Sequence, residues 1–175
     1  MADEIINVVD EFDNPLGKEW KSVCHAKGLW HKSVLIVVLN GKGEFLLQMR
    51  STIKSICPNK YCMSAAGHVL EDESYEDAAP RELEEELGIT PQLYFIGKFS
   101  TDHILPNNKI NKEHYHLYYC IYDGEFNLDK EEVSYVKFFS VDKISELIKE
   151  TPDQFTKGFI HGFTNFFKFK EDHGL

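Results

Sequence analysis

Three glutamates near the middle of the chain have the residue type and spacing needed to hold a divalent cation. Glu82, Glu85 and Glu86 follow an i, i+3, i+4 pattern, which places their carboxylates within an arc of about 100° on a helix. Neighbouring like charges cost roughly a few tenths of a kcal/mol per pair, and a bound cation would offset that cost. Oxygen ligands that leave room for water and phosphate suit Mg²⁺, so the pattern indicates metal-assisted attack of water on a diphosphate.

The glutamates fall within a segment that has the signals of a helix, residues 74–87. Ser74 is a good N-cap, Asp77 stands where it can complete a capping box, and Gly88 would end the helix. Pro80 lies inside the segment, where its missing N–H predicts a kink or a locally unwound turn. Beside the glutamates runs an apolar stripe that would seat the helix on the core, formed by Ala79, Leu83 and Leu87.

The glutamates also belong to a longer pattern that begins at Gly67. Its fixed positions are Gly67, Glu73, Arg81, Glu82, Leu83, Glu85, Glu86, Gly88 and Ile89. Together they resemble the Nudix box, G-x5-E-x7-R-E-U-x-E-E-x-G-U with U an aliphatic residue, and every constrained position is met, which is improbable by chance. The resemblance covers most of the chain, roughly residues 32–145, because 45–50 look like the strand before the Nudix loop and 58–69 like the approach to the box.

This resemblance implies a role for each residue of the pattern. It assigns metal ligation to four groups, the carboxylates of Glu82, Glu85 and Glu86 and the backbone carbonyl of Gly67. Glu73 and Arg81 would form a structural pair that orients loop and helix, and Gly88 would end the catalytic helix. The implied cofactor is Mg²⁺, for which Mn²⁺ could substitute.

The general base varies within the Nudix family, so the sequence leaves several candidates open. One source is the box itself, here Glu85 or Glu86. A later loop is the other source, and its candidates are Glu113, Glu131 and Glu132. We rank Glu132 first because it directly precedes a predicted strand.

The chain also resembles type I isopentenyl diphosphate isomerases, which share the Nudix fold and hold a metal ion with histidines. By that resemblance His31 and His68 could contact metal or substrate. Residues 63–68 resemble the isomerase segment, but Ala66 stands where the isomerase has its catalytic cysteine, and Cys62 is four residues too early. In these isomerases the Nudix box is also incomplete, whereas every constrained position is met here. We therefore expect an isomerase-like hydrolase without isomerase activity.

Two further histidines, His114 and His116, lie on one side of a predicted strand and could form half of a metal site. No third ligand accompanies them at a suitable spacing. We interpret them as ordinary hydrogen-bonding residues.

The pattern of elements predicts one α+β domain over residues 1–175, with a mixed β-sheet sandwiched between helices as in the Nudix fold. An N-terminal extension of about 1–31 precedes it. Strands are expected at 5–10, 29–39, 44–50, 93–100, 114–122 and 133–140, helices at 18–26, 74–87, 141–150 and 152–168, and irregular structure at 51–66. The last helix carries phenylalanines at helical spacing, which predicts that it packs on the sheet.

Composition and charge limit the partners. The 175 residues are 42% hydrophobic and 27% charged, as in a globular protein, and no apolar run is long enough for a membrane span. A net charge of −10 argues against binding to long nucleic acid, but carboxylate-held cations can bridge an acidic protein to a small phosphorylated substrate. The acidic N-terminus lacks a signal peptide and the four cysteines are sparse, so we expect a cytoplasmic protein with reduced thiols.

The favoured activity is Mg²⁺-dependent hydrolysis of a diphosphate linkage in a nucleoside diphosphate derivative or a nucleoside triphosphate. Two alternatives stay open, isomerase activity on a prenyl diphosphate and a catalytically silent module that binds a nucleotide or protein. Substrate specificity is expected to reside in loops outside the box, residues 51–60 and 101–111. The N-terminal extension and the aromatic C-terminal helix could form the interface of a homodimer.

Overall fold

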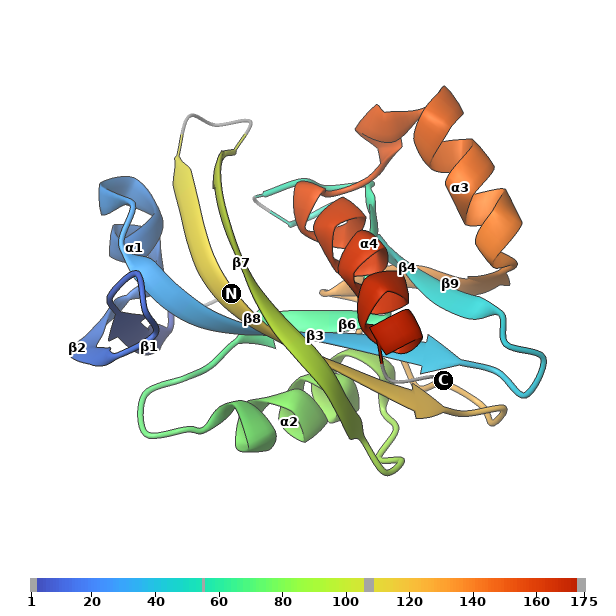
Figure 1. Cartoon of the computed structure of the whole chain (residues 1–175), viewed down its shortest axis with the longest axis horizontal. Helices are drawn as coiled ribbons and strands as arrows, with labels where there is room; N and C mark the ends of the chain where they lie inside the picture. Colours follow the sequence, from blue (N-terminus) through green and yellow to red (C-terminus); the bar gives the residue numbers. More distant parts are fainter. Residues whose placement is uncertain (1–2, 55, 106–108, 173–175) are drawn as a thin grey trace.

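The described part of the chain forms one nine-stranded sheet with helices on both of its faces (Figure 1). The computed structural model describes residues 3–54, 56–105 and 109–172. The strands are β1 (Ile5–Val9), β2 (Pro15–Trp20), β3 (Trp30–Leu39), β4 (Phe45–Arg50), β5 (Tyr61–Cys62), β6 (Ala65–His68), β7 (Tyr94–Ile104), β8 (Ile110–Ile121) and β9 (Val133–Phe139). The helices are α1 (Lys21–Lys27), α2 (Tyr75–Leu87), α3 (Val141–Glu150) and α4 (Lys157–Asp172), with a 3₁₀ turn, η1, at Pro152–Gln154. None of these helices is both long and apolar enough to cross a membrane.

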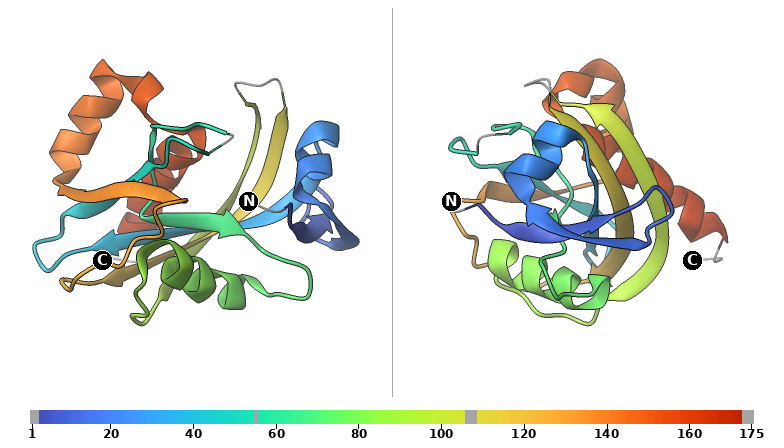
Figure 2. Two further views of the ribbon diagram at one scale, coloured as in Figure 1. Left: turned by 180° about the vertical axis from the view of Figure 1, so that it is seen from behind. Right: turned by 90° about the vertical axis from the view of Figure 1, so that its left-hand side faces the viewer.

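Strand β3 organises the sheet. It runs parallel to β8 over its whole length, from Trp30 opposite Lys112 to Leu39 opposite Ile121. It is antiparallel to β6 and β1, while β4 joins it at one residue pair and carries β5 and β9. Figure 2 shows the result, with α1, β1 and β2 at one end of β3 and β4, β9 and α3 at the other. The predicted mixed sheet is therefore confirmed.

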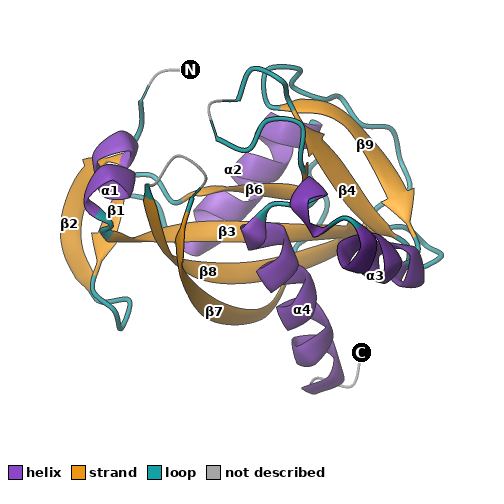
Figure 3. Cartoon of the chain, turned by 90° about the horizontal axis from the view of Figure 1, so that it is seen from above, coloured by secondary structure: helices purple, strands orange, loops and turns teal. Residues whose placement is uncertain are grey.

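The alternation of β3 divides the core into two layers. Its residues Val34, Ile36 and Val38 pack with α2, whereas Leu35 and Val37 pack with α4 on the opposite face. Figure 3 shows α2 behind the sheet and α3 and α4 in front of it. The predicted aromatic stripe is in this second layer, where the buried phenylalanines are Phe155, Phe159, Phe163 and Phe166. Because α4 uses this face in the core, an interface made by α4 would need its other surface.

The structure corrects four boundaries. Pro15–Trp20, expected to be a turn leading into a helix, is strand β2, and α1 begins only at Lys21. Residues 51–66, expected to be irregular, contain β5 and β6. Strand β6 has the sequence Ala-Ala-Gly-His, which carries almost no strand propensity, but its ladder with β3 supplies the hydrogen bonds. Strands β7 and β8 extend toward each other beyond their predicted ends because the hairpin ladder pairs Ile104 with Ile110.

The predicted local unwinding at Pro80 is wrong, since α2 is one continuous helix from Tyr75 to Leu87. Proline removes the bond that its N–H would give to the carbonyl of Glu76, one turn earlier. Both residues are exposed, so water can satisfy that carbonyl. The capping box between Ser74 and Asp77 and the buried apolar stripe hold the helix on both sides of the proline.

Candidate active site

Helix α2 turns its three glutamates toward one cleft of about 710 Å³. Its adjacent apolar stripe, with Leu83 and Leu87 fully buried, fixes the rotation of the helix against the core. Glu86 is 4% exposed, and the side chains of Glu82 and Glu85 are 13% and 57% exposed. We call Glu82, Glu85 and Glu86 the acidic face; it runs from the buried floor of the cleft to solvent.

Gly67 leaves room for the carboxyl group of Glu82 at the buried floor of the cleft. It lies on β6 opposite Val34, with its Cα against the carboxyl group of Glu82. A Cβ added to Gly67 would stand 1.9 Å from the carboxyl carbon of Glu82, far inside contact distance. The glycine of the box is therefore required by close approach rather than by an unusual backbone angle.

Arg81 ties the loop before α2 to the acidic face. Its guanidinium donates to both oxygens of Glu73, at 2.6 and 2.9 Å, and to the carbonyl of His68 at 3.0 Å. It also donates to the carboxylates of Glu82, at 2.8 Å, and Glu85, at 3.0 Å. Burial alone would raise the pKa of Glu73, but the hydrogen bonds from Arg81 and the Leu70 amide outweigh it, and that pKa is below its usual value. The sequence-predicted pair is thus in contact, and Gly88 ends the helix in a left-handed conformation.

The charges of the buried carboxylates are compensated only in part. Burial raises the pKa of Glu82 from 4.5 to about 7 despite Arg81, and burial together with the charge of Glu82 raises that of Glu86 to about 8. Among the described residues, the donors to the side chain of Glu86 are uncharged, the Ala66 amide at 3.1 Å and the Gln48 side chain at 3.0 Å. Oxygen donors that repel each other in a cleft have the character of a divalent-cation site. The acidic face and the Gly67 backbone beside it therefore fit Mg²⁺ or Mn²⁺.

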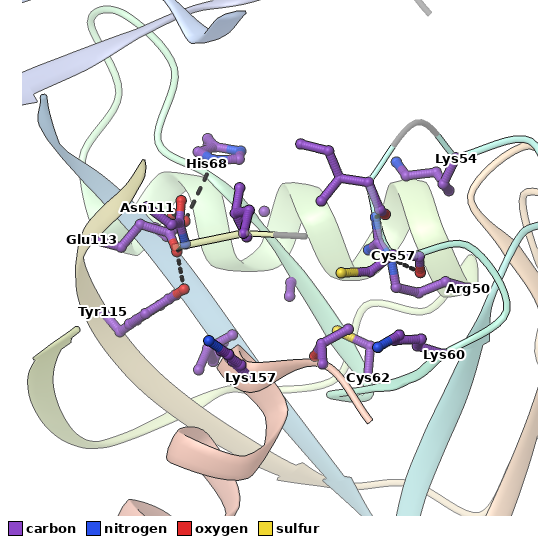
Figure 4. A pocket seen from close by; sticks show the side chains of 18 of the residues that line it. Arg50, Lys54, Cys57, Lys60, Cys62, His68, Asn111, Glu113, Tyr115 and Lys157 are labelled. Atoms are coloured by element: carbon purple, nitrogen blue, oxygen red, sulfur yellow. Dashed lines mark hydrogen bonds and ion pairs between the residues drawn. The ribbon is translucent and has the colours of Figure 1, made fainter. Parts of the chain in front are cut away.

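A second group of potential ligands adjoins the same cleft, of which His25, His68 and Glu113 are lining residues. His25 from α1, His31 from β3 and His68 from β6 bring ring nitrogens within 4.8 Å of one another. Glu113 from β8 places a carboxylate oxygen 3.6 Å from Nε2 of His31 and 3.5 Å from Nε2 of His68. We call these four residues the histidine cluster. Figure 4 shows His68 and Glu113 pointing toward each other across the strands.

The pKa values of His25, His68 and Glu113 are shifted in the directions that favour metal ligation. Burial, followed by the charge of His31, lowers the pKa of His25 to about 4, and burial holds that of His68 well below 6.5. Burial would raise the pKa of Glu113, but the neighbouring His31 and His68 outweigh it and keep a carboxylate. One ring nitrogen of each histidine is buried without a hydrogen-bond partner among the described residues. Buried ring nitrogens without hydrogen-bond partners beside a carboxylate fit a cation.

The network around Glu113 fixes its orientation. Its carboxylate accepts hydrogen bonds from the Ser33 hydroxyl at 2.7 Å, the Asn111 amide and the Tyr115 hydroxyl. This places Glu113, one of the sequence candidates for a general base, within the histidine cluster rather than beside the acidic face. The sequence missed His25 altogether, because nothing in the N-terminal extension distinguishes it from a surface histidine before the helix is docked.

The two remaining general-base candidates, Glu132 and Glu131, differ in their position relative to the cleft. Glu132 lines the cleft, makes an ion pair with Lys54, and raises the pKa of Glu86 through its charge. Its backbone carbonyl accepts from Ser51, which ties it to the loop after β4. Glu131 is exposed and does not line the cleft.

His114 and His116 stay outside both groups. The ring of His114 bonds to the Ser100 hydroxyl at 2.7 Å and to the Asp10 carbonyl at 3.0 Å. The ring of His116 stacks on Tyr75, with centroids 3.6 Å apart. Neither is among the described residues that line the cleft, in keeping with the sequence interpretation.

Basic side chains and thiols face the acidic groups. Arg50, Lys54 and Lys60 come from β4 and the loop after it, and we call them the basic wall; Figure 4 shows them on the side of the cleft opposite Glu113. Ala66 lines the cleft without a functional group, whereas Cys62 lines it with a buried thiol whose pKa is raised by burial. None of the four cysteines, all in the described part of the chain, forms a disulfide.

Sequence comparisons agree with this geometry. The family model described as NUDIX domain matches residues 29–159. An isopentenyl-diphosphate Delta-isomerase 2 of Photorhabdus laumondii subsp. laumondii is 37% identical over 157 residues, which cover 90% of this chain and 89% of that protein. An uncharacterized Nudix hydrolase of Clostridium acetobutylicum is 32% identical over 170 residues, covering 91% of this chain and 82% of the other. Relatives that cover similar shares of this chain are therefore named either as an isomerase or as a Nudix hydrolase.

Solved structures support the fold. A crystal structure from Deinococcus radiodurans matches with a TM-score of 0.72 at 21% identity, covering 85% of this chain and 90% of that one. The NUDIX domain of Shewanella oneidensis NrtR, solved in complex with ADP ribose, matches with a TM-score of 0.59 at 15% identity, covering 82% and 88%. At these identities the likeness concerns the arrangement of strands and helices alone.

Proposed function

The chain belongs to the Nudix family, and on that premise we propose that it is a Mg²⁺-dependent pyrophosphohydrolase that cleaves a phosphoanhydride with water. One observation carries the proposal: Glu82, Glu85 and Glu86 line one cleft that the basic wall also lines. The carboxylates fit the cation and the basic wall fits the anionic phosphates, so a single cavity has both halves of the required chemistry.

The residues of the chain have distinct tasks in this mechanism. A bound Mg²⁺ or Mn²⁺ would polarise a phosphoryl oxygen and lower the pKa of a water. The acidic face holds the cation, and Arg81 keeps Glu82 and Glu85 aligned with it. Glu132 accepts one proton of the attacking water, whose oxygen bonds to phosphorus while the bridging oxygen leaves with its electron pair on the other phosphate. Glu85 and Glu86 are the alternative bases.

The expected partner is a small phosphorylated molecule, for which the sequence favours a nucleoside diphosphate derivative or a nucleoside triphosphate. The neighbour solved with ADP ribose is a precedent for nucleotide binding in this fold. A cytoplasmic location and a homodimer are further parts of the proposal. Solvent-exposed Phe12, Leu16 and Trp20 on the β1–β2 hairpin offer an apolar surface for the dimer.

A second candidate function is isomerisation of a prenyl diphosphate. Two observations favour it, the histidine cluster and the relatives named isopentenyl-diphosphate Delta-isomerase. The position beside Gly67 lacks the cysteine by which the isomerases move the proton, since Ala66 offers only a methyl group there. The complete acidic face also favours hydrolysis. A silent binding module is the third candidate, and the intact carboxylates weigh against it.

The test is a panel of diphosphates incubated with and without Mg²⁺, with products separated by ion-exchange chromatography. Hydrolysis that requires Mg²⁺ supports the proposal, whereas an allylic isomer without phosphate release would replace it with the second candidate. Glu85→Gln should abolish hydrolysis, and Glu84→Gln is the matched control because Glu84 is exposed on the same helix and does not line the cleft. Equal activity in both variants would overturn the site.

A further inference from the structure

The cleft offers no flat surface on which a nucleobase could stack. Among the described residues that line the cleft, the Phe, Tyr and Trp side chains are Tyr115 and Phe155. These two are only 5% and 3% exposed. The residues outside the described ranges contain none of these three types. Base recognition commonly relies on aromatic faces, so the cleft is lined for a different kind of molecule.

The histidines do not replace such a surface. The ring of His68 is stacked on His31 and meets His25 edge to face. His103, which also lines the cleft, lies against the ring of His161 with centroids 6.2 Å apart, and the guanidinium of Arg50 is held by the carbonyls of Ile56 and Cys57 at 3.0 and 3.2 Å. Each planar group is therefore committed to the protein itself.

The lining instead contains several basic side chains. Its basic residues are Lys21, Arg50, Lys54, Lys60 and Lys157. Lys21, Lys54 and Lys157 already contact Glu4, Glu132 and the Ile104 carbonyl. Lys60 differs, because no contact of its amine with the described residues is recorded, and it stands on the basic wall beside Arg50 (Figure 4). A cation left uncompensated in a cleft is suited to an anionic group of the ligand.

We infer that the substrate carries no nucleobase and bears a phosphate additional to the diphosphate that is cleaved, this extra phosphate lying on the basic wall next to Lys60. The inference rests on the proposed hydrolysis and narrows its substrate class, replacing the nucleoside part of the expectation. The acidic face with its cation holds the scissile diphosphate, and Arg50 and Lys60 hold the second anionic site.

Hydrolysis of such a compound is balanced by one water. The hydroxyl of the water joins one phosphorus, the anhydride oxygen stays with the other, and the remaining proton is released to the base and then to solvent. The products are inorganic phosphate and a bis-monophosphate. Neither an oxidant nor a second substrate is required.

Three commercial compounds test the inference with the intact protein and Mg²⁺. 5-Phosphoribosyl 1-diphosphate has the additional phosphate and no base, ADP-ribose has a base, and isopentenyl diphosphate has neither. We expect kcat/KM for the first compound to exceed the others by about 10-fold or more. A base platform would instead favour ADP-ribose, because base stacking alone is associated with about 5- to 100-fold in affinity.

Lys60→Ala identifies the contact. It should raise KM for the phosphoribosyl compound by about 10-fold with kcat unchanged, and should raise KM for isopentenyl diphosphate by a clearly smaller factor, because that compound has no additional phosphate to lose its contact. Lys42→Ala, a lysine in the β3–β4 turn outside the cleft, is the matched control. A preference for ADP-ribose, or equal losses on all three compounds in Lys60→Ala, would overturn the inference and leave the hydrolase intact. Absence of cleavage of any compound would instead overturn the proposed function.

Discussion

The acidic face and the histidine cluster lie in one cleft but are built in opposite ways. The three glutamates of the acidic face come from two adjacent turns of α2. The four residues of the histidine cluster come from α1, β3, β6 and β8. A helix fixes the spacing of the first group locally, whereas only the docking of an N-terminal helix and the β3–β8 ladder brings the second group together. Both therefore have ligand character, but they depend on different parts of the fold.

Their electrostatics differ as well. In the acidic face, burial raises the pKa of Glu86 to about 8, so a charge has to be compensated. In the histidine cluster, burial lowers the pKa of His25 to about 4, so the ring is neutral and its lone pair is available. A cation relieves repulsion in the first group and replaces missing hydrogen bonds in the second. We therefore predict that the acidic face takes part in the reaction, whereas the histidine cluster shapes its own part of the cleft.

The largest expected effect separates the two groups by activity. Glu86→Gln should lower kcat by about 1,000-fold or more, because it removes a ligand from the reacting cation. His68→Ala should lower kcat by less than about 10-fold, since the histidine cluster does not contact the scissile bond in the proposed mechanism. Steady-state kinetics on the same substrate compares them, with circular dichroism to verify folding. If His68→Ala lost as much activity as Glu86→Gln, the division of roles would be wrong.

A smaller effect concerns cation binding. The wild-type protein should bind Mn²⁺ at two kinds of site, and His31→Ala should weaken one of them by about 100-fold while leaving the other unchanged. Glu82→Gln should do the reverse. Electron paramagnetic resonance counts bound Mn²⁺ in both variants and requires no substrate. His114→Ala is the control, because His114 contacts Ser100 and Asp10 outside the cleft. A single class of site that is insensitive to His31→Ala would contradict the prediction that the histidine cluster binds a cation of its own.

The smallest effect is on stability without metal. Because the pKa of Glu86 is raised from 4.5 to about 8, the folded state binds its proton more tightly than the unfolded state. The stabilisation is complete below pH 4.5 and is lost as the pH rises through about 8. Glu86→Gln lacks this loss, so it should stabilise the metal-free protein by about 1–2 kcal/mol at pH 8.5 and not at pH 5. Urea unfolding in a chelator measures this, and a constant difference at both pH values would contradict the assignment.

The acidic face could be predicted from the sequence because its information is local. An i, i+3, i+4 pattern, an N-cap at Ser74 and a stop at Gly88 are all properties of one continuous segment. The phenylalanine stripe of α4 could be predicted for the same reason, because its helical spacing is also a local property. Sequence reasoning failed at Pro80, where packing of the whole helix outweighed a local rule, and at β5 and β6, whose short strands depend on partner strands instead of propensity.

What the sequence by itself determined is thus the type and rotation of elements, the identity of the acidic face and the family. Only the tertiary structure decided that Gly67 clears space for Glu82, that His25 joins His31 and His68, and that Glu113 belongs with these histidines. The physical reason is that contacts within a helix are set by a fixed rise and turn per residue. Contacts between distant segments depend on sheet register and helix docking, which arise only when the two core layers form.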